Sequence, residues 1–429
     1  MSHTVNTLPA LDDEAAHWPS VELNACPFPF YEGLRGQEAI YKHPDRDEYL
    51  VSRYADIRAI LKLPKAFSND IDGEAAAALE QVLGPGAECP VDRVVTSTNM
   101  PQSDPPEHTL KRRRSRFMVE PRRLESYEPI IEGLVHEQID AFLDRGTMEF
   151  CSEFANPLAF RLICRILGFT PAEVDVFWSK GNPTTGHGAR YLSAEERAEL
   201  EARPSPEDFL REQILARYEN PTEDALTELI QIHVEKDGVL PLEYLVTEAT
   251  LLLNAGNETT ARMLASTMRL LLDRPDVLAA ARADHALIPA VIEESLRYEA
   301  PTQWVTRRCV ADTDIGGTPI PAGALVVLLY ASANRDDERW GDDAAEFTIG
   351  REGSIKHQLA FGSGAHFCLG APIARLEGKI ALEILLDRIT NIAYADPDAP
   401  IENIHNIQKR APKELHLRFT ATEGGTGGR

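Results

Sequence analysis

The residues best suited to carry chemistry lie in a glycine-rich loop near the C-terminal end of the chain. The segment from Phe361 to Gly370 reads FGSGAHFCLG, and Cys368 stands just before the expected start of a helix. Three glycines in ten residues permit tight turns and a close approach of the backbone to a flat ligand. The N–H groups of a helix N-terminus favour a thiolate, which suits a metal ligand or a nucleophile. A nucleophile would need a base and an orienting partner, and only His366 is close in sequence. A buried, inert cysteine in a turn is the alternative.

A second candidate lies inside a long expected helix. Residues 255–260 read AGNETT, so an acid, Glu258, precedes an alcohol, Thr259. Gly256 weakens a helix interior by about 1 kcal/mol relative to alanine, and threonine hydroxyls can bond back to the preceding turn. An acid beside an alcohol can relay protons inward from solvent. The segment indicates either room for a ligand or water beside the helix, or a plain helix crossing with Glu258 in solvent.

Charged residues at helical spacing form two further pairs. Glu294 and Arg297 are three residues apart, so they lie on one helix face and can pair there. Taken alone, this spacing also fits a surface ion pair worth under about 1 kcal/mol. His108 and Arg112 are one helical turn apart and could act together, whereas a single histidine is more often a surface residue.

Together these motifs resemble those of the cytochromes P-450, the haem-thiolate monooxygenases. The glycine-rich loop is similar to the family's haem-ligand loop, Phe-Gly-x-Gly-x-His/Arg-x-Cys-x-Gly, at every fixed position. Residues 255–260 are similar to its oxygen-binding segment, Ala/Gly-Gly-x-Asp/Glu-Thr-Thr/Ser, and ANRD at 333–336 is typical of its bacterial soluble members. The resemblance runs from about Glu48 to Phe419. It implies a mainly α fold with a minor β portion, built as one large domain with a long central helix around haem b.

The resemblance also implies roles for the haem-binding residues. Cys368 would be the axial thiolate of the iron, whose electron donation favours O–O cleavage. Arg307 matches the family's strand-borne arginine, but a slip of one residue would exchange it with Arg308. The residues expected to contact haem are Phe361, Gly362 and Gly370 of the loop, Ala255 and Gly256 of the long helix, and the propionate partners His108, Arg112, Arg307 and His366.

Further roles implied by the resemblance concern proton delivery and the scaffold. Glu258 and Thr259 would supply protons during oxygen activation. Glu294 and Arg297 would form, with Arg351, a charged network that supports the fold and indirectly the haem. Family members that consume peroxide directly often lack the acid–alcohol pair, so its presence favours dioxygen and electrons as co-substrates.

Composition limits the partners of the protein. The chain of 429 residues has 44 Lys+Arg against 68 Asp+Glu, a formal net charge of −24. Nucleic acid and anionic membrane surfaces repel such a body, so neither is expected as a partner. The six cysteines show no CxxC spacing, and the N-terminus has no apolar signal core. We therefore expect a cytoplasmic monomer, with no fused reductase.

One basic run stands out in this acidic chain. The segment from Lys111 to Arg123 holds seven basic residues and one acid. A solvated helix face is the plain interpretation. If Arg112 turns towards the haem, however, Arg113, Arg114 and Arg116 would flank its thiolate side, and a local positive patch would steer an acidic partner. The hypothesis is a docking site for a small acidic iron–sulfur ferredoxin, served by an NADH- or NADPH-dependent reductase.

The elements that must position these residues are mostly helices. Residues 1–35 are expected to be irregular, residues 36–420 to form the catalytic domain and residues 421–429 a Gly-rich flexible tail. Because helices and strands do not alternate, a doubly wound sheet is excluded. The expected elements are helices at 55–61, 241–272, 289–299 and 371–386 and strands at 49–54, 315–320, 325–330 and 415–420.

The resemblance to the cytochromes P-450 places the substrate over the haem face opposite Cys368. The candidate lining carries few charges, which suggests a small to medium apolar molecule, a terpenoid or an aromatic, hydroxylated at a C–H bond. Two alternatives stay open: a peroxide-driven haem-thiolate oxidase and a non-catalytic haem-binding sensor. The candidate walls are the loops 94–100, 181–188 and 406–408, and within or beside them Met100, Leu252, Ala255, Trp304 and Val305.

Overall fold

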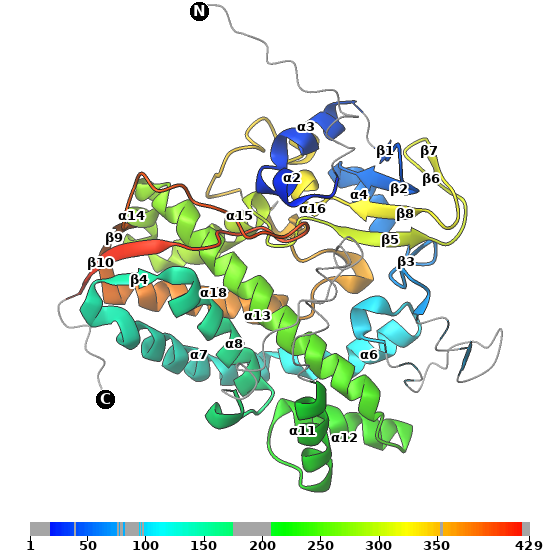
Figure 1. Ribbon diagram of the computed structural model, residues 1–429, viewed down its shortest axis with the longest axis horizontal. Coiled ribbons are helices and arrows are strands. Elements are labelled where there is room, and N and C mark those ends of the chain that lie inside the picture. The colour runs from blue at the N-terminus through cyan, green and yellow to red at the C-terminus, as the bar shows by residue number, and fades with distance from the viewer. Residues whose placement is uncertain are drawn as a thin grey trace, which may run out of the picture.

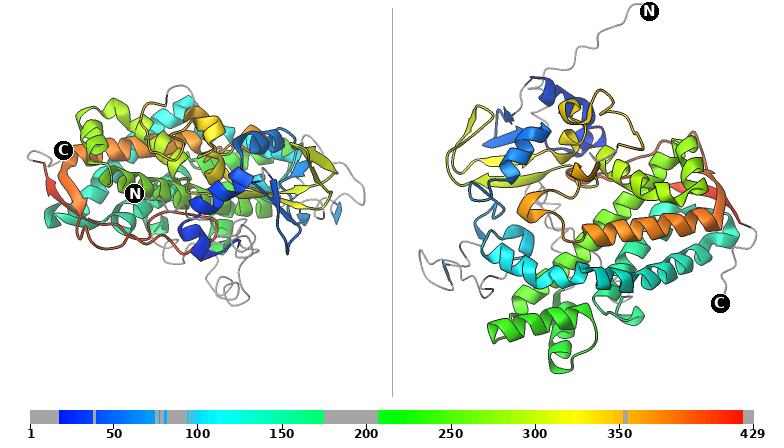
Figure 2. Two further views of the ribbon diagram at one scale, coloured as in Figure 1. Left: turned by 90° about the horizontal axis from the view of Figure 1, so that it is seen from above. Right: turned by 180° about the vertical axis from the view of Figure 1, so that it is seen from behind.

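A long helix crosses a body of helices that carries a small sheet on one side (Figure 1). The computed structural model describes residues 18–37, 40–74, 77, 80–81, 94, 96, 98–174, 207–351 and 355–422. Figure 2 shows α18 and α7 side by side on the face turned away from the viewer in Figure 1. The principal helices are α4 (Tyr54–Leu61), α6 (Glu107–Ser115), α7 (Pro121–Phe142), α8 (Asn156–Ile166), α11 (Glu207–Glu219), α12 (Ala225–Asp237), α13 (Leu242–Leu272), α14 (Pro275–Ala283), α15 (Ile288–Tyr298) and α18 (Ala371–Arg388).

The central helix α13 has the bounds that the sequence predicts. Pro241 lies at its N-cap, where a missing N–H costs nothing. It ends at Leu272, because Pro275 disfavours helical dihedrals at the residue before it, and Arg274 has non-helical dihedrals, with φ −134° and ψ 76°. Its 31 residues pack against α8, α11, α15 and α18 within the main apolar core. A helix buried along so much of its length can hold side chains at fixed positions deep inside the molecule.

The larger sheet joins three strands from residues 40–68 to two strands from residues 305–328. Its strand order is β1-β2-β8-β5-β3, with β2 parallel to β8 and β5 antiparallel to β8. A separate three-stranded sheet, β4-β10-β9, packs beside the helices. This mixture confirms the predicted mainly α fold with a minor β portion. The strands are β1 (Ile40–Lys42), β2 (Glu48–Val51), β3 (Phe67–Ser68), β4 (Thr147–Glu149), β5 (Val305–Cys309), β6 (Thr313–Ile315), β7 (Thr318–Ile320), β8 (Leu325–Leu328), β9 (Ile389–Tyr394) and β10 (His416–Ala421).

Two expectations about local structure are wrong. The described part of the N-terminal segment is not irregular: it forms α2 (Val21–Ala25) and α3 (Phe28–Gln37), which bury Phe30, Tyr31 and Leu34 in a core cluster. The strand expected at 315–320 is a hairpin, because two glycines with positive φ, Gly316 and Gly317, turn the chain between β6 and β7. The loop 181–188 and residues 423–429 lie outside the described residues.

Candidate active site

The cysteine loop closes on itself immediately before α18. The backbone N–H of Cys368 donates to the carbonyl oxygen of Phe361 at 2.8 Å. Gly362 and Gly364 have φ of +69° and +73°, which favour glycine. A Cβ atom on Gly364 would lie 2.9 Å from the carbonyl oxygen of Leu61, so the loop also needs glycine to pack against the end of α4. The turn thereby holds the cysteine at a fixed position.

The sulfur of Cys368 lies at the N-terminus of α18. It accepts hydrogen bonds from the N–H groups of Gly370 and Ala371. Burial raises the pKa of the thiol, while these two N–H groups and the guanidinium groups of Arg112 and Arg375 lower it. The residue nevertheless retains solvent-exposed surface. The sulfur is thus held by backbone donors on a residue that keeps exposed surface, an arrangement that suits a metal-binding thiolate.

Cationic side chains gather beside the cysteine. The rings of His108 and His366 stack with their centroids 3.7 Å apart. Burial, together with the guanidinium groups of Arg112 and Arg307, lowers the pKa of His108 to about 4, so this imidazole is neutral at pH 7. Arg307 is buried and hydrogen-bonds to Tyr330. Within the described residues, the half-buried Arg112 makes no hydrogen bond or ion pair with protein. The cluster therefore has unused capacity to bind an anionic group.

The alternation of side chains along strand β5 shows which of the adjacent residues Arg307 and Arg308 faces the site. Side chains alternate along a strand, so neighbours point to opposite faces. Arg308 donates to the carbonyl oxygens of Ile71 and Gly323, the latter at 2.9 Å. Arg307, and not Arg308, therefore lies beside His108.

Glu258 and Thr259, the predicted acid and alcohol, lie in the same turn of α13. The Oγ1 of Thr259 donates to the carbonyl oxygen of Ala255 at 2.6 Å, the back-bonding that threonine in a helix predicts. The carboxylate of Glu258 forms an ion pair with Arg262 one turn later. Ala255 is exposed although α13 crosses the centre of the molecule, so the helix has an open side at this turn.

Packing gives one reason why residue 256 is a glycine. A Cβ atom at Gly256 would lie 3.0 Å from Cγ1 of Ile163 in α8. This glycine therefore serves the close crossing of α13 and α8, the alternative that the sequence left open. The helix continues without interruption through this position.

The expected substrate walls are only partly supported. Trp304 is fully buried, lies 5.4 Å from the ring of Trp18 and donates to the carbonyl oxygen of Ile407, so its assignment to the substrate site is wrong. Met100 is buried, and its N–H donates to Glu248 of α13 at 3.1 Å. Two other predicted wall residues, Leu252 and Val305, are half-buried.

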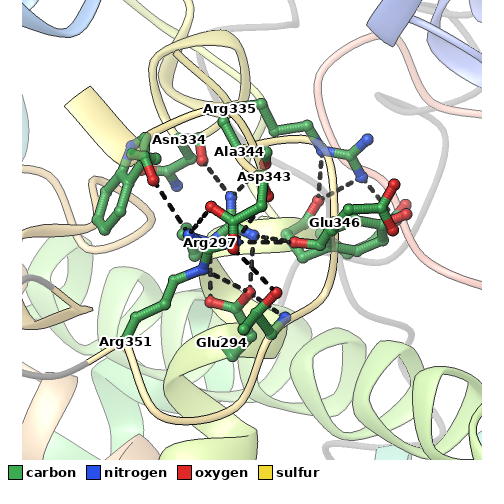
Figure 3. Close-up of polar contacts among 12 residues, drawn as sticks. Glu294, Arg297, Asn334, Arg335, Asp343, Ala344, Glu346 and Arg351 are labelled. Carbon is green, nitrogen blue, oxygen red and sulfur yellow. Dashed lines mark hydrogen bonds and ion pairs between the residues drawn. The ribbon is translucent and has the colours of Figure 1, made fainter. Parts of the chain in front are cut away.

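The three members of the charged network lie together (Figure 3). Glu294 accepts hydrogen bonds from Arg297 at 2.7 Å and from Arg351 at 3.1 Å, and it is almost completely buried. Arg297 also donates to the carbonyl oxygens of Asn334 and Ala344, each at 2.7 Å. The network ties α15 to the long loop that precedes the cysteine. It is a buried scaffold and not the surface ion pair that the spacing alone allows.

The basic run divides into exposed and buried residues. Arg113 and Arg116 are exposed and line a surface hollow of about 730 Å³ with Phe117 and Lys236. Arg114 also borders the hollow, but its side chain is only 4% exposed and pairs with Asp237 at 2.5 Å. The expectation that Arg114 presents its charge to a partner is therefore wrong: it joins α6 to α12.

Comparison with known proteins identifies the family. The cytochrome P450 family model matches residues 189–405. Cytochrome P450 107B1 of Saccharopolyspora erythraea is 34% identical over 373 residues, 87% of this chain and 89% of that protein. The monooxygenase PikC of Streptomyces venezuelae is 34% identical over 406 residues, 93% of this chain and 92% of PikC. The chain belongs to the cytochrome P450 family. Cytochrome P450 CYP109Q5 from Chondromyces apiculatus has the same fold, with a TM-score of 0.76 at 32% identity over 94% of this chain and 97% of its own.

As a cytochrome P450, the protein is a monooxygenase whose cofactor is haem b with a cysteine thiolate ligand. The described residues fit that group. A sulfur held by backbone donors and an arginine without a protein partner, Cys368 and Arg112, match an iron and a propionate. Among the described helices, none is both long enough and apolar enough to cross a bilayer.

Three charged residues near the site were not predicted, and one of them is Arg375, whose guanidinium group lowers the pKa of Cys368. Arg262 could have been found from its spacing, because it follows Glu258 by four residues. Lys409 lies within electrostatic reach of Glu258 and Cys368, although the chain separates it from both. Nothing in the sequence indicates that contact, because it depends on the path of the C-terminal segment.

Proposed function

We propose that this cytochrome P450 inserts one oxygen atom of O₂ into a C–H bond of a small to medium, largely apolar substrate, with Cys368 as the axial ligand. The observation that carries the proposal is the sulfur of Cys368, which accepts two backbone hydrogen bonds at the N-terminus of α18, on a residue that keeps exposed surface. When bound there, haem supplies the activation of dioxygen. The N–H donors lower the basicity of the sulfur and hold it in place.

The cationic cluster would hold the propionates. Arg112 and Arg307 carry permanent charge, while neutral His108 and the stacked His366 can donate ring N–H bonds. Because Arg112 has no protein partner among the described residues, an anion there gains a charge-assisted bond without displacing an existing one.

Glu258 and Thr259 would move protons between solvent and the open side of α13. The hydroxyl proton of Thr259 points to the carbonyl of Ala255, which leaves its oxygen as an acceptor towards the open side. The carboxylate of Glu258 is part-exposed and held by Arg262, so it can exchange protons with water while it stays near Thr259.

The names of related proteins support a largely apolar substrate. One curated relative is the 6-deoxyerythronolide B hydroxylase of Saccharopolyspora erythraea, 34% identical over 296 residues. A solved relative from Bacillus megaterium, CYP109E1, was crystallised with testosterone, at 27% identity. Testosterone is mostly hydrocarbon. The half-buried Leu252 and Val305 of this chain suit such a body, and a terpenoid or an aromatic remains our assignment.

Electrons would come from a small acidic ferredoxin that docks over α6. The exposed Arg113 belongs to α6 and the exposed Arg116 lies at its C-terminal end, next to Arg112, which lies near Cys368. Reversing both charges, Arg113→Glu with Arg116→Glu, should lower the rate of reduction by an acidic ferredoxin at least about tenfold at low salt, and less at high salt. The control reverses Lys413 and Arg418, which are exposed at or near β10. Equal rates in the two double variants would reject the docking site.

Turnover with a ferredoxin and its reductase tests the activity. Product formed under ¹⁸O₂ should carry one labelled oxygen atom. Thr259→Ala and Glu258→Gln should each lower the yield of product per NADPH about tenfold or more, because proton delivery is impaired. If hydrogen peroxide alone supports the same rate, and neither variant changes the yield, the protein is a peroxide-driven oxidase. If no haem-dependent turnover occurs with any substrate tested, the sensor alternative is favoured.

A further inference from the structure

A lysine side chain reaches the active site from the C-terminal segment. Lys409 and Thr302 form an isolated antiparallel bridge. On either side of this bridge, the N–H of Gln303 donates to Gln408 at 2.9 Å and that of Arg410 donates to Pro301 at 3.0 Å. The Nζ of Lys409 donates to Oγ1 of Thr302 at 2.8 Å. These contacts fix the ammonium group beside the loop that enters β5.

The ammonium group beside Thr302 is within electrostatic reach of both α13 and the cysteine loop. Glu258 and Cys368 both raise its pKa and Arg262 lowers it, so all three are within electrostatic reach of Nζ. Burial is the largest influence and lowers the pKa of Lys409 to about 8. At neutral pH the group is therefore mostly charged, although burial disfavours the charge.

Both negative groups within electrostatic reach of this lysine are committed elsewhere. Glu258 forms an ion pair with Arg262, and Cys368 is the thiolate proposed to bind the iron. Among the described residues, the only side-chain partner of Nζ is the neutral hydroxyl of Thr302. An ammonium group has three N–H donors, so two are left for another acceptor. A buried cation without a matched anion is costly, and a bound anion would remove that cost.

A second polar group faces the same region without a partner. Asn254 lies one turn before Glu258, on the same face of α13. Both polar atoms of its amide are buried and have no hydrogen-bond partner among the described residues. Buried polar groups are almost always paired, so the unpaired amide indicates a missing ligand or water. The amide can donate to an oxygen, as Lys409 can.

We infer that Lys409, with Thr302 and Asn254, receives a carboxylate group of the substrate and so determines its specificity. The substrate then has an apolar body, which suits Leu252 and Val305, and one carboxylate that anchors it and selects the carbon to be hydroxylated. A neutral ester or alcohol of the same skeleton leaves the ammonium unpaired and binds less well. This inference rests on the proposed function and narrows its substrate class.

Calorimetric titration of the haem-loaded protein tests the inference with matched ligands. The probes are terpenoid and aromatic carboxylic acids of eight to sixteen carbons and their methyl esters. Wild type should bind at least one acid about tenfold or more tighter than its ester, the ratio expected for a charge-assisted bond. Lys409→Met should lose that preference and leave the affinity for the ester within about twofold. Lys409→Arg should keep most of the preference, and Lys413→Met, an exposed lysine four residues later, should match wild type.

Three outcomes would overturn the inference. They are equal affinity of wild type for acid and ester throughout the series, no binding of any acid, and a preference for the acid that survives in both Lys409→Met and Lys409→Gln. The wild-type comparison needs no variant, so it holds even where a variant folds poorly. The CO-bound spectrum separates failure of the proposed function: without a thiolate-type band, Cys368 is not the ligand, whatever the acid preference.

Discussion

Replacing Glu294 by glutamine tests whether the buried charged network holds the fold around the site. The carboxylate accepts N–H bonds from Arg297, Arg351 and the backbone of Thr348. Side-chain exposure is 1% for Glu294, 0% for Arg297 and 7% for Arg351. Glutamine has nearly the same shape, but it removes the only negative charge that both arginines contact here and turns one acceptor into a donor.

The structure sets the size of the effect. Removing one partner from a buried ion pair costs about 3–5 kcal/mol, because an uncompensated charge remains buried. A native protein is stable by only about 5–15 kcal/mol in total. Glu294→Gln should therefore lose about a fifth or more of the free energy of unfolding, and with it haem retention, since Arg297 and Arg351 tether the loop that leads to Cys368.

Urea unfolding at equal haem saturation measures this cost. The matched control is Glu137→Gln, which breaks the exposed pair with Arg161, whose side chains are 63% and 37% exposed. That variant should cost under about 1 kcal/mol. If Glu294→Gln folds and costs no more than the control, the network does not stabilise the protein. If it does not fold, Arg351→Gln, which leaves the Glu294–Arg297 pair intact, should fold with a smaller loss.

Two further predictions concern single positions on the cysteine loop and α18. Gly364→Ala should lower the free energy of unfolding by at least about 1 kcal/mol, because its φ is +73° and the new Cβ atom would press on Leu61. The control Gly370→Ala should cost less, because Gly370 has an ordinary φ and its Cβ atom would make no contact below 4.0 Å. Equal shifts of the melting temperature in the two variants would contradict this prediction. Burial raises the pKa of Glu377 from 4.5 to about 8, so between these values the unfolded chain has lost a proton that the folded protein keeps, and stability falls as pH rises. Glu377→Gln should therefore stabilise the protein by about 3 kcal/mol at pH 7 and by little at pH 4.5, since one pKa unit corresponds to about 1.36 kcal/mol. A gain in the free energy of unfolding that does not grow with pH would refute this prediction.

Local patterns predicted the elements that carry the site. The bounds of α13 follow from prolines at both ends, and the bonding of Thr259 to Ala255 follows from the habit of threonine in helices. The loop of Cys368 follows from its glycines, two of which have positive φ. These features depend on residues within a few positions of one another, which the sequence displays directly.

Features that depend on distant packing were not predictable. The sequence does not reveal that Ile163 fills the space beside Gly256, that Trp304 turns to Trp18, or that Arg114 meets Asp237. Lys409 is the clearest case, because its approach to Glu258 requires the bridge to Thr302. Which side of an element faces the site is set by tertiary contacts, which neither the resemblance nor the spacing of residues along the chain displays.

The absorption spectrum of the reduced, CO-bound protein tests the central claim most directly. Wild type should show the red-shifted Soret band that is typical of thiolate ligation. Cys368→His, which keeps a ligand for the iron, should retain haem and lose that band, while Cys26→Ala, at an exposed cysteine, should keep it. A thiolate-type band in the haem-loaded Cys368→His variant would show that another cysteine holds the iron and would contradict the account.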